Sequence, residues 1–119
     1  MYPEATMPAD ALEDLLVQHM HIRHARISAD VALALRILKR CETPIREREL
    51  AESVRHNKGE SGNEGFTRFR SALYWLMHHR VLEHCIHERL LKIRLREQTV
   101  DPLGSRILAM LYESTPSEE

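Results

Sequence analysis

A chain of 119 residues has the length of one domain and can build a single hydrophobic core, which excludes a two-domain enzyme. Its composition, 43% hydrophobic and 29% charged, is typical of globular proteins and excludes general disorder, and no run approaches the about 18 consecutive apolar residues of a membrane-spanning helix. Only four Gly, five Pro and 5% aromatic residues are present, which predicts a mainly α-helical protein with a smaller β component (α+β).

The formal net charge of −1 hides a segregation of charge along the chain: residues 66–96 carry +5, and the rest of the chain carries −6. An anionic partner is therefore expected to approach residues 66–96. The two cysteines, Cys41 and Cys85, lie far apart and form no paired metal or redox motif. Together with the lack of a basic and then apolar leader after Met1, they predict a cytoplasmic protein in a reducing compartment.

The first predicted helix spans residues 8–25, where apolar side chains recur at helical spacing on one side. A second helix is predicted to begin at Ser28, a residue type favoured as an N-cap, and to continue to Arg40. Its apolar residues cover two sides of the cylinder, since Leu33 and Ile37 lie away from the main stripe. This helix is therefore expected at the centre of the fold.

Residues 43–45, Thr-Pro-Ile, are predicted to form a short extended segment, because the residue before a proline is disfavoured in a helix. A third helix is expected over 46–55, then a glycine-rich loop over 56–65 and a fourth helix over 66–79. The outer face of this fourth helix is expected to be polar and cationic.

Two interpretations fit residues 81–96. Apolar and polar side chains alternate there as in the two strands of a hairpin, and the alternation is clearest over 91–96. A helical stripe through Leu82, Cys85 and Ile86 also fits, and the turn expected near residues 87–89 lacks the Gly, Asn or Asp that hairpin turns prefer. We favour the hairpin.

A last helix is predicted over 101–113, with Asp101 as its N-cap and Pro102 at its first position. The first and last helices each have an apolar face, and these faces either pack together within one molecule or form a twofold interface between two copies. We expect a homodimer, because the central helix needs more partners than the core supplies. The residues predicted for the dimer interface are Leu12, Leu15, Leu16, Ile22, Leu103, Ile107, Met110 and Leu111.

The order of the predicted elements over 28–96 resembles the winged helix-turn-helix superfamily. The resemblance is carried by residues 34–38 (Ala-Leu-Arg-Ile-Leu), 43–51 (Thr-Pro-Ile-Arg-Glu-Arg-Glu-Leu-Ala), 69–76 (Phe-Arg-Ser-Ala-Leu-Tyr-Trp-Leu), 81–82 (Val-Leu) and 91–95 (Leu-Lys-Ile-Arg-Leu). The chain departs from the superfamily in its long glycine-rich segment, and in His79-Arg80, which replace the glycine common after the recognition helix. One domain is expected over 1–119, with the winged core at 28–96 between the terminal helices.

This resemblance implies that the fourth helix enters the major groove of DNA and that the hairpin, or wing, contacts the backbone or the minor groove. Arginine can bond guanine bidentately, and a row of cations can follow a phosphate backbone. The expected function is sequence-specific binding of double-stranded DNA by a small dimeric transcription regulator. The residues expected to contact DNA are Thr67, Arg68, Arg70, Ser71, Tyr74, His78, Arg89, Lys92, Arg94 and Arg96.

The alternative is a protein-interaction module on the same scaffold, an adaptor or inhibitor that binds no DNA. Tyr74, Trp75 and the neighbouring arginines would be its anchors, because these residue types are enriched at binding hot spots.

No catalytic motif, phosphate loop or dinucleotide fingerprint is present, so we expect no enzyme activity and no cofactor. The eight histidines are numerous, and His21 with His24, or Cys85 with His87, could supply two ligands to a metal. A structural zinc site needs four ligands, so no metal site is predicted.

Overall fold

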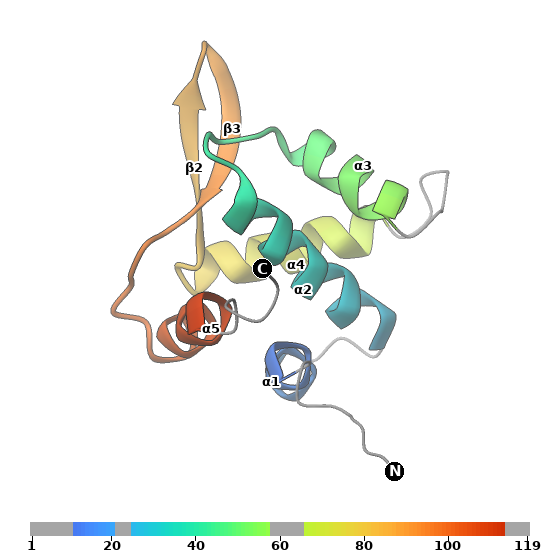
Figure 1. The fold of residues 1–119 in the computed structure, drawn as a ribbon, viewed down its shortest axis with the longest axis vertical. Coiled ribbons are helices and arrows are strands. Elements are labelled where there is room, and N and C mark those ends of the chain that lie inside the picture. Colours follow the sequence, from blue (N-terminus) through green and yellow to red (C-terminus); the bar gives the residue numbers. More distant parts are fainter. Residues whose placement is uncertain (1–10, 21–24, 58–65, 114–119) are drawn as a thin grey trace.

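The computed structural model describes residues 11–20, 25–57 and 66–113. The helices are α1 (Ala11–His19), α2 (Ala25–Arg40), α3 (Glu47–Asn57), α4 (Phe66–His78) and α5 (Pro102–Glu113), and the strands are β2 (Leu82–His87) and β3 (Leu90–Leu95) (Figure 1). The predicted class, mainly helical with a small antiparallel β component, is confirmed. No described helix is long and apolar enough to cross a membrane.

Helix α2 lies at the centre of the fold, as its two-sided apolar pattern predicts. It packs against α1, α3, α4 and β3 (Figure 1). Its main stripe is buried, with Val31, Ala34 and Leu35 fully inaccessible, and Leu33 and Ile37 on another side pack against the same core. The burial of both sides explains why this helix carries few exposed apolar groups.

The predicted start of this helix was wrong. Helix α2 begins at Ala25, and Ser28 lies inside it, 1% exposed. Since residues 25–27 already have helical backbone geometry, the Ser28 hydroxyl cannot cap the first turn, and it has no hydrogen-bond partner among the described residues. The first helix ends at His19, before the predicted end at residue 25, and the predicted start at residue 8 lies outside the described residues.

The first and last helices pack against each other, and α1 also packs on α2. Their apolar faces form part of the common core. Five residues of the predicted dimer interface are at most 3% exposed: Leu12, Leu15, Leu16, Ile107 and Leu111. Packing within one molecule therefore accounts for them, and they are not available to a second copy. Leu103 and Met110 are partly buried against the core, and Ile22 lies outside the described residues.

Helix α4 ends in a Schellman motif centred on Arg80. The Arg80 amide donates to the Met77 carbonyl at 3.0 Å, and the Val81 amide donates to the Leu76 carbonyl at 2.9 Å. Arg80 has a φ of 61°, the left-handed conformation that glycine adopts most easily. The fold thus needs a left-handed residue at this position, and the sequence supplies arginine.

Residues 81–96 form the predicted hairpin and not a helix. Strands β2 and β3 pair in register from Leu82 with Leu95 to His87 with Leu90. The turn has only two central residues, Glu88 (φ 54°) and Arg89 (φ 69°), and both have positive φ, as in a type I′ turn.

The segment between α2 and α3 is tied to the base of this hairpin. The Ile45 amide donates to the Ile93 carbonyl at 3.2 Å, and the Ile93 amide donates to the Ile45 carbonyl at 2.8 Å. The predicted extended piece at 43–45 therefore adds one bridge to the edge of β3.

Helix α5 is capped by Asp101, as predicted, and the same carboxylate fixes it to α4. Asp101 Oδ2 accepts a hydrogen bond from the Gly104 amide at 2.8 Å and lies 3.0 Å from His79 Nδ1. A Cβ atom on Gly104 would lie 2.0 Å from the His79 carbonyl oxygen, so only glycine permits this contact. The start of α5 is therefore locked onto the C-terminal end of α4.

Candidate nucleic-acid interface

The outer face of α4 is polar, as expected. Its inner side buries Phe69, Leu73 and Leu76, because apolar residues recur at three- and four-residue spacing. The remaining predicted contact residues of this helix that the structure describes are exposed: Arg70, Ser71, Tyr74 and His78. The side chains of Thr67 and Arg68 lie outside those described.

Arg70 is held in place by two partners. Its Nε donates to the Tyr74 hydroxyl at 3.2 Å and lies 3.0 Å from Glu47 Oε1. The guanidinium carbon also lies 5.4 Å from the centre of the Tyr74 ring. The hydrogen bond to Tyr74 and the charge of Glu47 raise the pKa of Arg70, so its positive charge is secure at any physiological pH.

Glu47 joins three elements at this face. It stands at the start of α3, and its second carboxylate oxygen lies 3.9 Å from His84 Nε2 on β2. The His84 ring in turn lies 6.3 Å from the Tyr74 ring. The beginning of α3, the outer face of α4 and strand β2 thus converge on one polar cluster of Glu47, Arg70, Tyr74 and His84. Sequence reasoning missed Glu47 and His84, because nothing local relates them to α4.

Strand β3 does not present the row of free cations predicted from the sequence. Lys92 is only 9% exposed, and its Nζ lies 3.1 Å from Glu88 Oε1 and 3.3 Å from His87 Nδ1. The hydrogen bond and the charge of Lys92 lower the pKa of Glu88. The expectation that Lys92 belongs to an exposed row of cations was wrong, because its side chain is buried and its Nζ lies beside Glu88 and His87.

The other two cations of the predicted row share one carboxylate. Glu83 lies directly across from Arg94 in the sheet. Its Oε2 accepts from Arg94 Nε at 2.7 Å, and its Oε1 accepts from Arg96 Nη1 at 3.0 Å. Glu83 raises the pKa of Arg94 through this bond and its charge. The ion pair of Glu83 with Arg94 follows from the hairpin register, but the net charge of residues 66–96 does not show which charges are paired.

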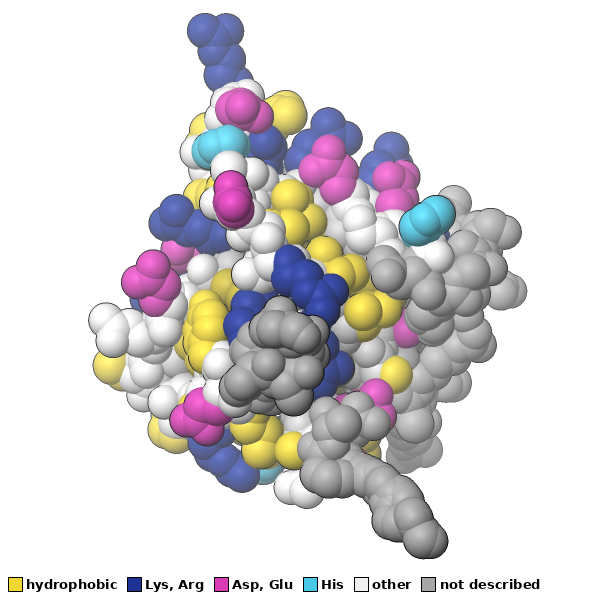
Figure 2. All heavy atoms as spheres, in the orientation of Figure 1, with side chains coloured by type: hydrophobic (Ala, Val, Ile, Leu, Met, Phe, Trp, Pro, Cys, Tyr) yellow, Lys and Arg dark blue, Asp and Glu magenta, His cyan; other side chains and the backbone are white. Residues whose placement is uncertain are grey.

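Arg80 and Arg89 differ from these paired cations. Both are exposed, and neither lies within ion-pair distance of a carboxylate among the described residues. In Figure 2, the Lys and Arg side chains around the hairpin are interspersed with Asp and Glu. The face seen there is therefore mixed in charge and not continuously basic.

The hairpin also exposes apolar side chains that the sequence pattern assigned to a half-buried face. Ile86 and Leu91 lie opposite each other in the register and are 71% and 59% exposed. Leu90, beside the turn, is 44% exposed. The outer half of the hairpin extends beyond the helices that cover its base (Figure 1), so no described helix shields this pair.

Trp75 does not project from the polar face as a free anchor. It is partly buried against the core, and its ring meets the His79 ring edge-on with 4.7 Å between their centres. Its neighbour Tyr74 is 42% exposed. Of the two aromatic anchors expected for a protein partner, Tyr74 is therefore the more exposed.

The described residues contain no cluster of three or more His, Cys, Asp or Glu side chains able to hold a metal ion. Of the pairs considered from the sequence, His21 and His24 lie outside the described residues. Cys85 lies across from Lys92. Cys41 directly follows α2, and burial raises the pKa of its thiol, a setting that disfavours a reactive thiolate.

No protein-family model matches the chain, and comparisons with curated proteins and with solved structures gave no match.

Proposed function

We propose that the protein is a small DNA-binding regulator of the winged helix-turn-helix type, with α4 as the recognition helix and the β2–β3 hairpin as the wing. The observation that supports this best is the outer face of α4, where Arg70, Ser71, Tyr74 and His78 are exposed beside the hairpin. The succession α2, α3, α4 and hairpin, with Ile45 bridged to Ile93, is the order such a domain requires.

Arg70 is the residue to which we assign the leading role in contact with DNA. The Tyr74 hydroxyl and the Glu47 carboxylate hold its guanidinium, which reduces the conformational entropy lost when it binds a base edge or a phosphate. DNA must displace the Glu47 carboxylate, an exposed ion pair that is individually weak. The paired state of Lys92, Arg94 and Arg96 leaves Arg89 at the turn as the free cation of the described part of the hairpin. The proposal therefore rests on few phosphate contacts and predicts modest non-specific affinity.

The test is fluorescence anisotropy of a labelled duplex at two salt concentrations, with Arg70→Ala beside Arg106→Ala. Arg106 is exposed on α5, outside the proposed interface, so its variant matches the loss of charge. Arg70→Ala is expected to weaken duplex binding about tenfold or more, and Arg106→Ala to leave it nearly unchanged. Equal affinities of the wild type and Arg70→Ala, or no binding of any duplex at low salt, would overturn the proposal.

A protein-interaction module is the second candidate, and the exposed pair Ile86 and Leu91 favours it. An apolar pair at the end of a projecting hairpin, with Tyr74 accessible on α4, provides the residue types that protein partners bury. This candidate predicts no salt-sensitive affinity for duplexes, and a protein complex that Ile86→Ser with Leu91→Ser disrupts while the fold is retained. Intact complexes in that double variant would exclude the hairpin as the docking surface.

A further inference from the structure

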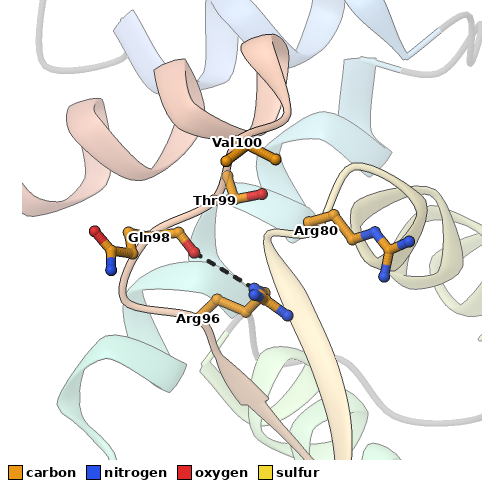
Figure 3. A pocket seen from close by; sticks show the side chains of 5 residues that line it. All are labelled: Arg80, Arg96, Gln98, Thr99 and Val100. Carbon is orange, nitrogen blue, oxygen red and sulfur yellow. Dashed lines mark hydrogen bonds between the residues drawn. The ribbon is translucent and has the colours of Figure 1, made fainter.

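An open surface pocket with a volume of about 530 Å³ lies at the base of the hairpin, away from the outer half of β2 and β3. Figure 3 shows the five residues that line it, which come from the turn after α4 and from the segment between β3 and α5: Arg80, Arg96, Gln98, Thr99 and Val100. Its volume falls within the range of small-molecule sites. Two guanidinium groups line it, and no carboxylate does.

Arg80 reaches this pocket from a strained backbone position. It adopts the left-handed conformation at the end of α4, where glycine would cost least, and it has no carboxylate partner among the described residues. The Schellman motif accounts for this conformation. The positive charge of Arg80, which no described carboxylate offsets, therefore lies at the pocket.

Arg96 is oriented by two acceptors. Its Nη1 donates to Glu83 Oε1 at 3.0 Å, and its Nε donates to the Gln98 carbonyl at 3.4 Å (Figure 3 draws the latter bond). Its Nη2 has no partner among the described residues. An arginine fixed at two nitrogens loses little side-chain entropy when the third binds a ligand.

We propose that this pocket binds a small oxyanion, the phosphate group of a free small molecule, between Arg80 and Arg96. Guanidinium groups match the geometry of phosphate oxygens, and the Thr99 hydroxyl provides a further polar group at the rim. Because the lining joins the end of α4 to the start of the segment before α5, a bound anion would hold these two parts together. The proposal does not depend on DNA binding.

The experiment is a titration of the full chain with sodium phosphate, against sodium chloride at equal ionic strength, followed by backbone and arginine side-chain NMR. Two variants of Arg80 distinguish the effect of losing its charge from the effect of relieving its backbone strain. Arg80→Gly removes the guanidinium and relieves the backbone, whereas Arg80→Ala removes the guanidinium and keeps the strained conformation. Arg106→Ala, on the exposed side of α5, is the control for loss of one charge.

Saturable shifts at Arg80, Arg96 and Thr99 are expected in the wild type and in Arg106→Ala. Both Arg80 variants are expected to weaken phosphate binding equally, by at least about tenfold, because the lost group is a charged hydrogen-bond donor. Linear shifts without saturation, or wild-type affinity in Arg80→Gly, would overturn the site. If Arg80→Gly instead weakens duplex binding as much as phosphate binding, the oxyanion comes from a DNA backbone, and the free small molecule is excluded.

Discussion

At the scale of single residues, Arg80 offers the sharpest test of backbone strain. We expect Arg80→Gly to be more stable than Arg80→Ala by about 1 kcal/mol, because only glycine adopts a φ of 61° without a steric cost. Urea unfolding of the two variants measures the difference. Comparing two variants that both lack the guanidinium removes its contribution from the result, and equal midpoints would show that the turn relaxes around alanine.

Gly104 is a second residue whose role depends on one contact. Gly104→Ala is expected to destabilise the fold by about 2 kcal/mol, since the new Cβ would meet the His79 carbonyl oxygen, and overpacked sites lose stability of this order. Thermal unfolding checks this, with Ser105→Ala as the control, because Ser105 is the exposed neighbour in the same helical turn. Similar stabilities of the two variants would mean that α5 can move away from α4 at no cost.

The Asp101 carboxylate makes stability depend on pH. The hydrogen bond from the Gly104 amide, and then the contact with His79, lower its pKa below the ordinary 3.8. A carboxylate whose pKa is lower in the folded state than in the unfolded state stabilises the fold at pH values above its unfolded-state pKa. This contribution to stability is lost as the pH falls through the pKa of the folded state.

We therefore expect Asp101→Asn to flatten the loss of stability between about pH 5 and pH 2. The measurement is urea unfolding at a series of pH values, and Glu97→Gln, at an exposed carboxylate, is the control. An unchanged pH profile in Asp101→Asn would assign the acid sensitivity to other carboxylates.

At the scale of the element, the hairpin carries its own counterions. Glu83 holds Arg94 and Arg96 at the same time, so a phosphate backbone must compete with this carboxylate for both. Exposed ion pairs of this kind are individually weak, and DNA can displace them at a cost. On the proposed function, Glu83 acts as an internal competitor that limits non-specific binding.

Glu83→Gln is accordingly expected to tighten the binding of an unrelated duplex and to steepen the salt dependence by about 1.8 in log–log slope, for two additional phosphate contacts. Glu97→Gln changes the net charge equally without freeing an arginine that the structure pairs, and it is the control in the same anisotropy titration. If both variants behave alike, net charge alone explains the effect and Glu83 is no competitor.

Some elements could be predicted from the local sequence and others could not. The alternation over 91–96 predicted β3, and a two-residue turn was unexpected only because Glu88 and Arg89 are poor type I′ residues. Ser28 failed as an N-cap because residues 25–27 continue the helix backwards, which depends on packing and not on local preference. Asp101 succeeded because capping is local: the carboxylate and the amide it accepts from are three residues apart.

At the scale of the whole molecule, the packing of α1 on α5 changes the expected assembly. The sequence could identify two apolar helix faces, but it could not choose between a partner in the same chain and a partner in another copy. Burial of Leu16 and Ile107 at 0% exposure decides in favour of the same chain. The sequence could not predict the polar cluster of Glu47, Arg70, Tyr74 and His84 either, because the cluster depends on how α3, α4 and β2 pack together.

We predict that the protein is a folded monomer when dilute, with an unfolding midpoint that does not change with protein concentration. Light scattering after size exclusion and thermal unfolding at two concentrations test this. A midpoint that rises with concentration would require a dimer through other surfaces, for which the exposed Ile86 and Leu91 on the hairpin are available apolar groups.

The contact between the first and last helices also governs when the protein can fold during synthesis. The core includes Leu12 from α1 and Leu111 from α5, so it is incomplete until α5 has left the ribosomal exit tunnel. Until then α1 can pack on α2 but lacks its contact with α5, and a nascent chain at that stage exposes apolar surface of the kind that chaperones bind.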